Sequence, residues 1–190
     1  MMHGLFARRL MAPASLGAAA TAAVLTLAAC SPSPPHPAGT HGAAAAAAPA
    51  SGNAGQLGSA LAVSDSNGTQ LDVTLTKVID PADGASQYSN PASGKHFVGV
   101  QLNIKNTASS TYQNNANNET TITLSDGKTV HAGYNPIAGC ANFDNGQVKL
   151  KSHAASTGCV TFQVPEGQKV IRVGYGNTVF PGQTAEWRVS

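Results

Sequence analysis

Cys140, His153 and Cys159, with Asp144 nearby in the chain, have side chains that could bind a metal ion. Thiolate and imidazole groups are the ligands that zinc prefers in tetrahedral sites. Their spacing matches neither a CxxC nor an HxxxH pattern, and two cysteines in an exported chain usually pair with each other. We therefore predict a Cys140–Cys159 disulfide and no metal site; a crosslink that closes about 20 residues contributes roughly 3 kcal/mol. Blue copper usually needs a Met ligand, and all three Met residues precede Cys30.

No other set of residues has the spacing of a catalytic motif. The sequence has no Gly-x-Ser-x-Gly elbow for acyl transfer, and its nine acidic residues are too scattered to nominate a carboxylate pair for glycoside hydrolysis. Glu119, beside the Asn-rich residues 113–118, could join a calcium site with carbonyl groups, but an exposed polar loop is the simpler interpretation. His96 and His131 are expected at the surface or at a strand edge. We therefore predict a protein that is not an enzyme and uses no cofactor.

Cys30 directly follows Leu27-Ala28-Ala29, at the end of an Ala-rich apolar stretch that comes after Arg8 and Arg9. A basic start, an apolar middle and small residues before the cut form a secretory signal peptide, to which we assign residues 1–29. The apolar stretch is short for a membrane-spanning helix, which needs about 20 residues. Its end resembles the lipobox of bacterial lipoprotein signal peptides, in which the Cys becomes the lipidated first residue. An uncleaved anchor and cleavage without lipid are the alternatives, and the export route is left open.

Lipidation of Cys30 would hold the protein by membrane lipid on the extracellular face of the cell membrane. One acyl chain binds a membrane only marginally, so a stable anchor takes more than one. The resemblance implies a diacylglyceryl group on the thioether and often a further acyl chain on the amino group. Residues 30–56 are rich in Pro, Ala, Gly and Ser. Because this composition buries too little apolar surface to fold, we predict a disordered tether there.

The charge of the chain does not indicate a nucleic-acid partner. Two of the 11 basic residues, Arg8 and Arg9, lie in the leader, whereas all 9 acidic residues follow it, so the rest of the chain is formally neutral. Nucleic-acid binders carry clustered basic charge, which this sequence lacks. A neutral surface rich in Thr, Asn, Ser and Gly also argues against electrostatic steering of charged partners.

Residues 57–190 alternate apolar and polar side chains, which is typical of strands with one buried face. The clearest strand, expected at the centre of a sheet, contains Val98, Val100, Leu102 and Ile104. Other strands are predicted around residues 60–65, 71–76, 120–124, 128–132, 147–151, 160–164, 171–175 and 185–189. Trp187 and Phe180 are expected in the core. Because no stretch has a convincing helical period, we predict an all-β fold, an antiparallel β-sandwich of about seven to nine strands.

One hairpin can be predicted in more detail. A two-residue turn at Asp126-Gly127 would mix the apolar and polar faces of its two strands. A three-residue loop, residues 125–127, instead places Ile122 opposite Val130. It also puts Gly127 at the left-handed position that such loops require. The burial pattern therefore favours the three-residue loop.

Three segments of this domain resemble a known family. They are LDVTLTKVIDPA at residues 71–82, PASGKHFVGVQLNIKNT at residues 91–107 and GCVTFQVPEG at residues 158–167. Together they resemble the immunoglobulin-like domain of unknown function found in many Gram-positive, especially actinobacterial, lipoproteins. That family is similar to the secreted immunoprotective antigens of mycobacteria. The resemblance implies an immunoglobulin-like β-sandwich in the cell envelope, and it implies no catalytic residue because the family has no assigned active site.

The predicted function is that of a membrane-anchored extracellular binding or interaction module without catalytic activity. Its partner would be an envelope protein, a wall polymer or a small ligand. Loops on a rigid scaffold commonly carry binding residues, so we nominate the loops at residues 86–91 and 111–118. The candidate binding residues in these loops are Tyr88, Tyr112, Asn114 and Asn115.

Two alternatives to this function stay open. An enzyme could assemble its site from carboxylates, His and Tyr on separate strands, and a pocket with two acids or a His–Asp pair would favour that interpretation. A purely structural surface antigen would instead be abundant and have no tight partner.

Overall fold

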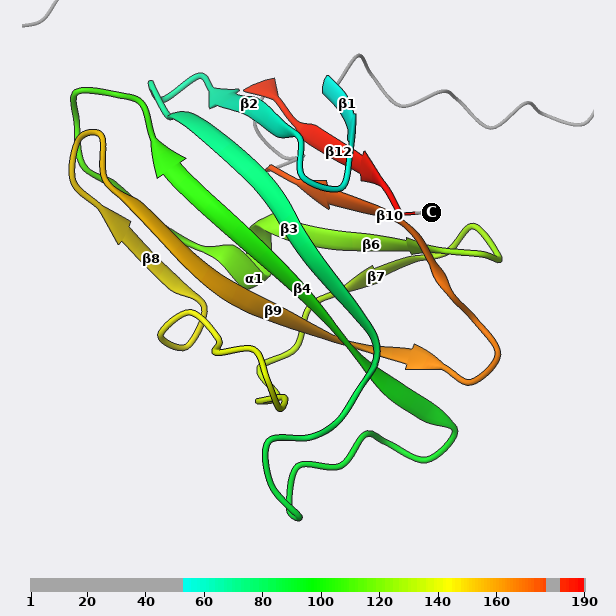
Figure 1. Ribbon diagram of the computed structural model, residues 1–190. Coiled ribbons are helices and arrows are strands. Elements are labelled where there is room, and N and C mark those ends of the chain that lie inside the picture. Colours follow the sequence, from blue (N-terminus) through cyan, green and yellow to red (C-terminus); the bar gives the residue numbers. More distant parts are fainter. Residues whose placement is uncertain (1–52, 177–181, 190) are drawn as a thin grey trace, which may run out of the picture. The chain divides into compact units, whose positions relative to one another are not determined.

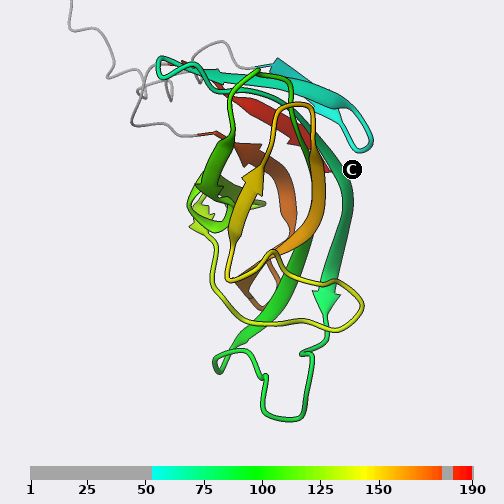
Figure 2. The ribbon, with the colours of Figure 1, turned by 90° about the vertical axis from the view of Figure 1, so that its left-hand side faces the viewer.

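The computed structural model describes residues 53–176 and 182–189 of the chain (Figure 1). The predicted signal peptide, Cys30, most of the tether and Phe180 lie outside the described residues. Within them, two five-stranded sheets form the layers of a β-sandwich (Figures 1 and 2). The predicted fold class is therefore confirmed. No helix in the described part of the chain is long and apolar enough to cross a membrane.

The first sheet has the strand order β1-β12-β10-β6-β7: β1 (Asn53–Gln56), β12 (Ala185–Arg188), β10 (Val170–Tyr175), β6 (Thr120–Leu124) and β7 (Thr129–His131). The second has the order β11-β2-β3-β4-β9: β11 (Gly182–Gln183), β2 (Ala60–Asp65), β3 (Gln70–Ala82), β4 (Lys95–Asn106) and β9 (Ala155–Pro165). A separate ribbon pairs β5 (Tyr112–Asn115) with β8 (Gln147–Leu150), and the short helix α1 (Ala116–Glu119) joins β5 to β6. The paired strands are antiparallel, except that β1 runs parallel to β12.

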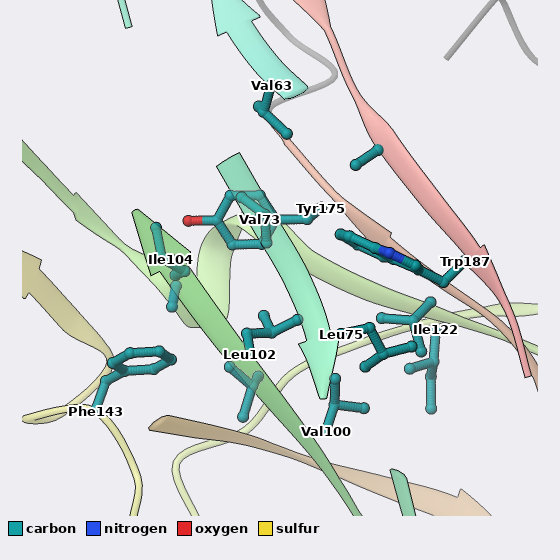
Figure 3. Close-up of a cluster of buried hydrophobic side chains, with 14 of the residues drawn as sticks. Val63, Val73, Leu75, Val100, Leu102, Ile104, Ile122, Phe143, Tyr175 and Trp187 are labelled. Carbon is teal, nitrogen blue, oxygen red and sulfur yellow. The ribbon is translucent and has the colours of Figure 1, made fainter. Parts of the chain in front are cut away.

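The main core forms where the apolar faces of the two sheets meet (Figure 3). The register of β3 and β4 places Leu75 opposite Leu102, so their side chains lie on the same face of the sheet. Ile122 and Trp187 come from the other sheet and are fully buried. Burial of one such apolar side chain stabilises the fold by roughly 1.5–3 kcal/mol. Trp187 is in the core as predicted, and its indole Nε1 donates a hydrogen bond to the backbone oxygen of Ser59 at 2.8 Å.

A smaller apolar cluster lies on the opposite face of β4 and β9. It contains Ala82, Phe97, Ile137, Cys140 and Cys159. The Cys140–Cys159 disulfide is present as predicted, with the two Cα atoms 5.8 Å apart. The backbone nitrogen of Cys159 also donates to the oxygen of Ala141 at 2.8 Å. The disulfide therefore holds the long connection between β7 and β8 against the outside of the second sheet.

Three predictions about the strands need correction. The described residues contain twelve strands rather than seven to nine, because β1, β5 and β11 are short, show little apolar alternation and were not predicted. The strand that contains Val98 to Ile104, β4, has a partner on each side, but β3 is the central strand of its sheet. The tether was expected to extend to residue 56, yet its last four residues form β1 and pair with β12. This pairing uses backbone groups, which composition does not reveal.

The hairpin between β6 and β7 agrees with the prediction. Ile122 lies opposite Val130, and Gly127 has the left-handed φ of +83°. The alternation predicted for residues 171–175 would put Ile171 on the buried face with Val173 and Tyr175, and this prediction is wrong at Ile171, which is 36% exposed. The register of β10 on β6 shifts between Val170 and Arg172. Such an irregularity moves one residue out of the alternation, so Val170 is buried instead.

Candidate functional site

A cavity of about 220 Å³ opens at the edge of the sandwich, where β2, β10 and the β5–α1 segment meet. The turn between β2 and β3 and the residues around β11 complete its wall. Its ionisable and hydrogen-bonding side chains include Asp65, Tyr112, Asn114, Glu119 and Tyr175. They come from four separate elements, β2, β5, α1 and β10, so only the packing of these elements brings them together.

Tyr112 and Tyr175 form the inner wall of the cavity. Tyr112 is 8% exposed and Tyr175 is 2% exposed, and their hydroxyl oxygens lie 3.1 Å apart. Figure 3 shows the hydroxyl of Tyr175 directed away from Trp187. Burial raises the pKa of Tyr112 to about 12 and raises the pKa of Tyr175 well above its ordinary value. Both side chains therefore keep their protons at neutral pH.

Glu119 is the buried acid of the cavity. It ends α1, a helix that begins where the side-chain oxygen of Asn115 accepts a hydrogen bond from the backbone nitrogen of Asn117 at 2.9 Å. Glu119 is 6% exposed, and its Oε1 accepts a hydrogen bond from Nδ2 of Asn114 at 3.0 Å. Burial raises the pKa of Glu119, and the negative charge of Asp65 raises it further. Such perturbed acids in a pocket are candidates for functional groups.

Asp65 stands at the mouth of the cavity and shapes the turn between β2 and β3. Its Oδ1 accepts hydrogen bonds from the backbone nitrogens of Asn67 at 2.9 Å and Thr69 at 3.0 Å. Partial burial raises the pKa of Asp65, but the hydrogen bonds from Thr69 and Asn67 outweigh burial and leave the pKa below its ordinary value. Asp65 therefore carries a negative charge beside the cavity at neutral pH.

The structure separates the four predicted binding residues. Tyr112 and Asn114 line the cavity, although Tyr112 lies on β5 and is buried, not exposed on a loop as predicted. Asn115 caps α1 and does not line the cavity. Tyr88 is 87% exposed. It lies in the connection between β3 and β4, which extends from another end of the sandwich (Figures 1 and 2).

Asp65 and Tyr175 are site residues that sequence reasoning missed. Tyr175 was assigned to a strand, and Asp65 to a strand end, but no local pattern indicated that either faces a cavity. The alternation of β10 could place the Tyr175 side chain in the core. It could not show that the hydroxyl reaches the ribbon formed by β5 and β8.

A second hollow, of about 530 Å³, lies beside Asp80, His96, Glu166 and Lys169. His96 Nε2 is 2.9 Å from Asp80 Oδ1, and His96 Nδ1 is 3.9 Å from Glu166 Oε2. The Nδ1 atom is buried, and no atom of the described residues forms a hydrogen bond with it. No Ser, Thr or Cys nucleophile occurs among the described residues that line this hollow. The pair links the adjoining strands β3 and β4, and without a side-chain nucleophile in this wall it could act only as a general base on water.

The zinc alternative is wrong, because Cys140 and Cys159 are joined in a disulfide. His153 and Asp144 are both exposed. Across residues 53–176 and 182–189 there is no group of three or more His, Cys, Asp or Glu side chains that could hold a metal ion. Glu119 faces the cavity with Asp65, the other carboxylate among the described lining residues, whereas calcium takes about six to eight oxygen ligands, several of them carboxylates.

A family model described as "Domain of unknown function (DUF4352)" matches residues 64–185, which is more than half of the chain. The chain belongs to the DUF4352 family. The match begins in β2 and ends in β12, so it contains the lining of the cavity from Ser64 to Thr184. No curated protein sequence matches this DUF4352 protein significantly.

A solved structure shows the same fold. The secreted protein MPT63 from Mycobacterium tuberculosis aligns with a TM-score of 0.53 and 16% identity, over 74% of this chain and 99% of that one. An uncharacterised β-sandwich protein from Clostridium difficile aligns with a TM-score of 0.44 and 10% identity, over 74% and 95% of the two chains. The yjhA protein from Bacillus subtilis aligns with a TM-score of 0.43 and 9% identity, over 70% of this chain and 98% of that one. At these identities the likeness to MPT63 establishes the fold of this DUF4352 protein and nothing about its ligand.

Proposed function

We propose that this DUF4352 protein is a membrane-anchored extracellular binding module without catalytic activity, and that its ligand enters the cavity beside Glu119. The observation that carries the proposal is the buried Glu119 carboxyl group, which faces a cavity and has a neutral amide as its hydrogen-bond partner. Burying an acid without an opposite charge lowers the stability of a fold. Such destabilising groups concentrate where proteins bind or react.

The anchor in this proposal is Cys30, supported by the lipobox-like residues before it. Residues 31–52 would lie between the lipid and β1. At about 3.3 Å per residue, a fully extended chain of this length spans roughly 70 Å. A tether of that length would let the domain reach molecules well above the membrane surface.

Lipidation can be tested by growing the native host with an alkyne-labelled fatty acid. The wild-type chain is expected to take up the label and to sediment with membranes. Cys30→Ser should do neither, whereas Ser31→Ala, a matched change one residue later, should behave like the wild type. Equal labelling of Cys30→Ser would show that Cys30 is not the lipidation site.

Ligand binding can be tested by native mass spectrometry of the full-length protein extracted from envelopes in a non-ionic detergent. Ser64→Leu places a larger apolar side chain on the cavity wall, and Tyr88→Ala changes an exposed residue elsewhere. A bound small molecule should be seen with the wild type and Tyr88→Ala and be lost from Ser64→Leu. Retention by Ser64→Leu would show that the cavity is not the binding site.

An enzyme is the second candidate, because Asp80 and His96 form a 2.9 Å pair beside a hollow. A His–Asp pair is part of many general-base systems. Substituting His96 with Gln separates the two functions. Loss of a hydrolytic activity with unchanged ligand retention in this variant would favour the enzyme. No change in either property would favour the binding module.

A further inference from the structure

We infer that the cavity beside Glu119 binds a small primary amine in its ammonium form. This inference rests on the proposed function and names the chemical class of the ligand. It is carried by the charges, the free acceptor atoms and the size of the cavity.

The charges around the cavity have one sign. Asp65 and Glu119 are the charged side chains among its described lining residues. The adjoining groove, of about 310 Å³, shares Asp65, Tyr112 and Asn114 with the cavity, and its described lining adds no Lys, Arg or His. The ion pairs between described residues include neither Asp65 nor Glu119. Both charges would therefore repel an anionic ligand, and a cation would supply the missing opposite charge.

The carboxyl group of Glu119 has an acceptor atom left for a ligand. Its Oε1 accepts the hydrogen bond from Asn114, and no described residue donates a hydrogen bond to Oε2. The Asn114 amide is fixed in this orientation because its Oδ1 accepts a hydrogen bond from the backbone nitrogen of Asn115 at 2.8 Å. A primary ammonium group carries three N–H donors. One of them can form a charge-assisted bond with the unused oxygen.

The two tyrosines provide further acceptors without competing charge. Their hydroxyls are hydrogen-bonded to each other at 3.1 Å, and each oxygen keeps acceptor capacity besides that bond. A protonated phenol is neutral, so it does not repel a cation and has no charge that a cation must balance. Glu119 and the tyrosine pair thus offer an ammonium group a charged acceptor and neutral acceptors on one cavity wall.

Size and ligand count favour a small amine over a metal ion. The cavity of about 220 Å³ is smaller than the roughly 300–1,000 Å³ of pockets for drug-sized ligands. Calcium takes about six to eight oxygen ligands, several of them carboxylates. This wall has two carboxylates, and Oδ1 of Asp65 already accepts two backbone hydrogen bonds. One ammonium group needs only a single carboxylate and a few neutral acceptors.

The test is a titration of the full chain, in non-ionic detergent and with ¹³C-labelled tyrosine, followed by NMR. The probes are ethylammonium chloride, the neutral 1-propanol, sodium propionate and calcium chloride. Ethylammonium should shift the resonances of Tyr112 and Tyr175 in a saturable way, and propionate should not. Glu119→Gln keeps the size of the side chain and its acceptor for Asn114 but removes the charge. It should weaken ethylammonium binding at least tenfold, whereas Tyr88→Phe should leave it unchanged.

The possible results separate the ligand class from the proposed function. Saturable shifts with 1-propanol and none with ethylammonium would overturn the ammonium inference and leave a cavity that binds neutral ligands. Calcium that saturates the site and displaces ethylammonium would replace the amine with a metal ion. Equal ethylammonium affinity in the wild type and Glu119→Gln would also overturn the inference. If no probe shifts either tyrosine and Ser64→Leu retains its natural ligand, the inference and the cavity assignment are both wrong.

Discussion

The hydroxyl oxygens of Tyr112 and Tyr175 lie 3.1 Å apart and connect the β5–β8 ribbon to strand β10 of the sandwich. Tyr112 is paired with Leu150 in the ribbon, and Tyr175 is paired with Thr120 and Ala185 in the sheet. This contact forms the inner wall of the cavity. It also holds the ribbon that carries Asn114, so the position of the Glu119 hydrogen bond depends on it.

Removing the two hydroxyls one at a time should cost more stability in total than removing both together. Tyr112→Phe or Tyr175→Phe leaves a buried hydroxyl without its partner, at a cost of about 1–3 kcal/mol. The double variant removes both groups, so its loss should be smaller than the sum of the single losses. A double-mutant cycle by urea denaturation should give a coupling energy of about 1 kcal/mol. Strict additivity would show that the two hydroxyls do not interact in solution.

Alkaline pH should weaken the fold through Tyr112. Burial raises the pKa of Tyr112 from 10.0 to about 12. Below pH 10 the hydroxyl is protonated in both states, so its contribution is fully present, and it is lost as the pH rises from 10 to 12 because the unfolded chain ionises first. Tyr112→Phe should flatten this part of the stability curve, measured by urea denaturation at each pH. An unchanged slope in the variant would contradict the assignment.

Glu119→Gln should stabilise the protein at neutral pH. Burial raises the pKa of Glu119 above its ordinary 4.5, so the wild type loses stability as the pH rises through that raised value. Asp65, Tyr112 and Tyr175 are the titratable groups that face Glu119, and at neutral pH none of them supplies a positive charge. Removing an uncompensated functional acid typically gains about 0.5–2 kcal/mol. The stability gained by Glu119→Gln, measured by urea denaturation, should appear at pH 8 and vanish near pH 4. An equal gain at both pH values would show that it comes from packing and not from the removed charge.

Gly158→Ala should destabilise the main core. A Cβ atom at Gly158 would lie 2.6 Å from Cδ1 of Phe143, whose ring is buried against β9. Overpacking of this kind costs about 1–3 kcal/mol. Gly133→Ala is the matched control, because its Cβ would meet Asn135 Oδ1 at 3.2 Å and could be accommodated by a small shift. Thermal unfolding should show a large loss for the first variant and a small one for the second.

Removal of the disulfide should loosen the segment that covers the outside of β4 and β9. Cys140 and Cys159 are 19 residues apart, and a crosslink of this length contributes about 3 kcal/mol. The double variant Cys140→Ser with Cys159→Ser should lose about that much, and a reductant should not affect it further. The wild type should fall to the same stability when reduced. A reduced wild type that keeps its full stability would show that the crosslink is dispensable.

The sequence by itself determined the sandwich, the β6–β7 hairpin and the disulfide. Each follows from a pattern within one segment of the chain or from the number of cysteines. Alternation along Val98 to Ile104 marks a strand with one buried face, Gly127 marks the left-handed loop position, and the two cysteines after Cys30 leave one pairing. The error at Ile171 is also local, since the register shift at Val170 moves Ile171 to the surface.

Only the tertiary structure decided the cavity. Tyr112 belongs to an Asn-rich stretch that reads as a polar loop, yet pairing with β8 turns its ring inward. Glu119 and Tyr175 are far apart in the sequence, and they meet because α1 packs where β10 ends. The physical reason is that periodicity reports which face of one element is buried. The convergence of side chains depends on the register and packing between elements, which no single segment of the sequence contains.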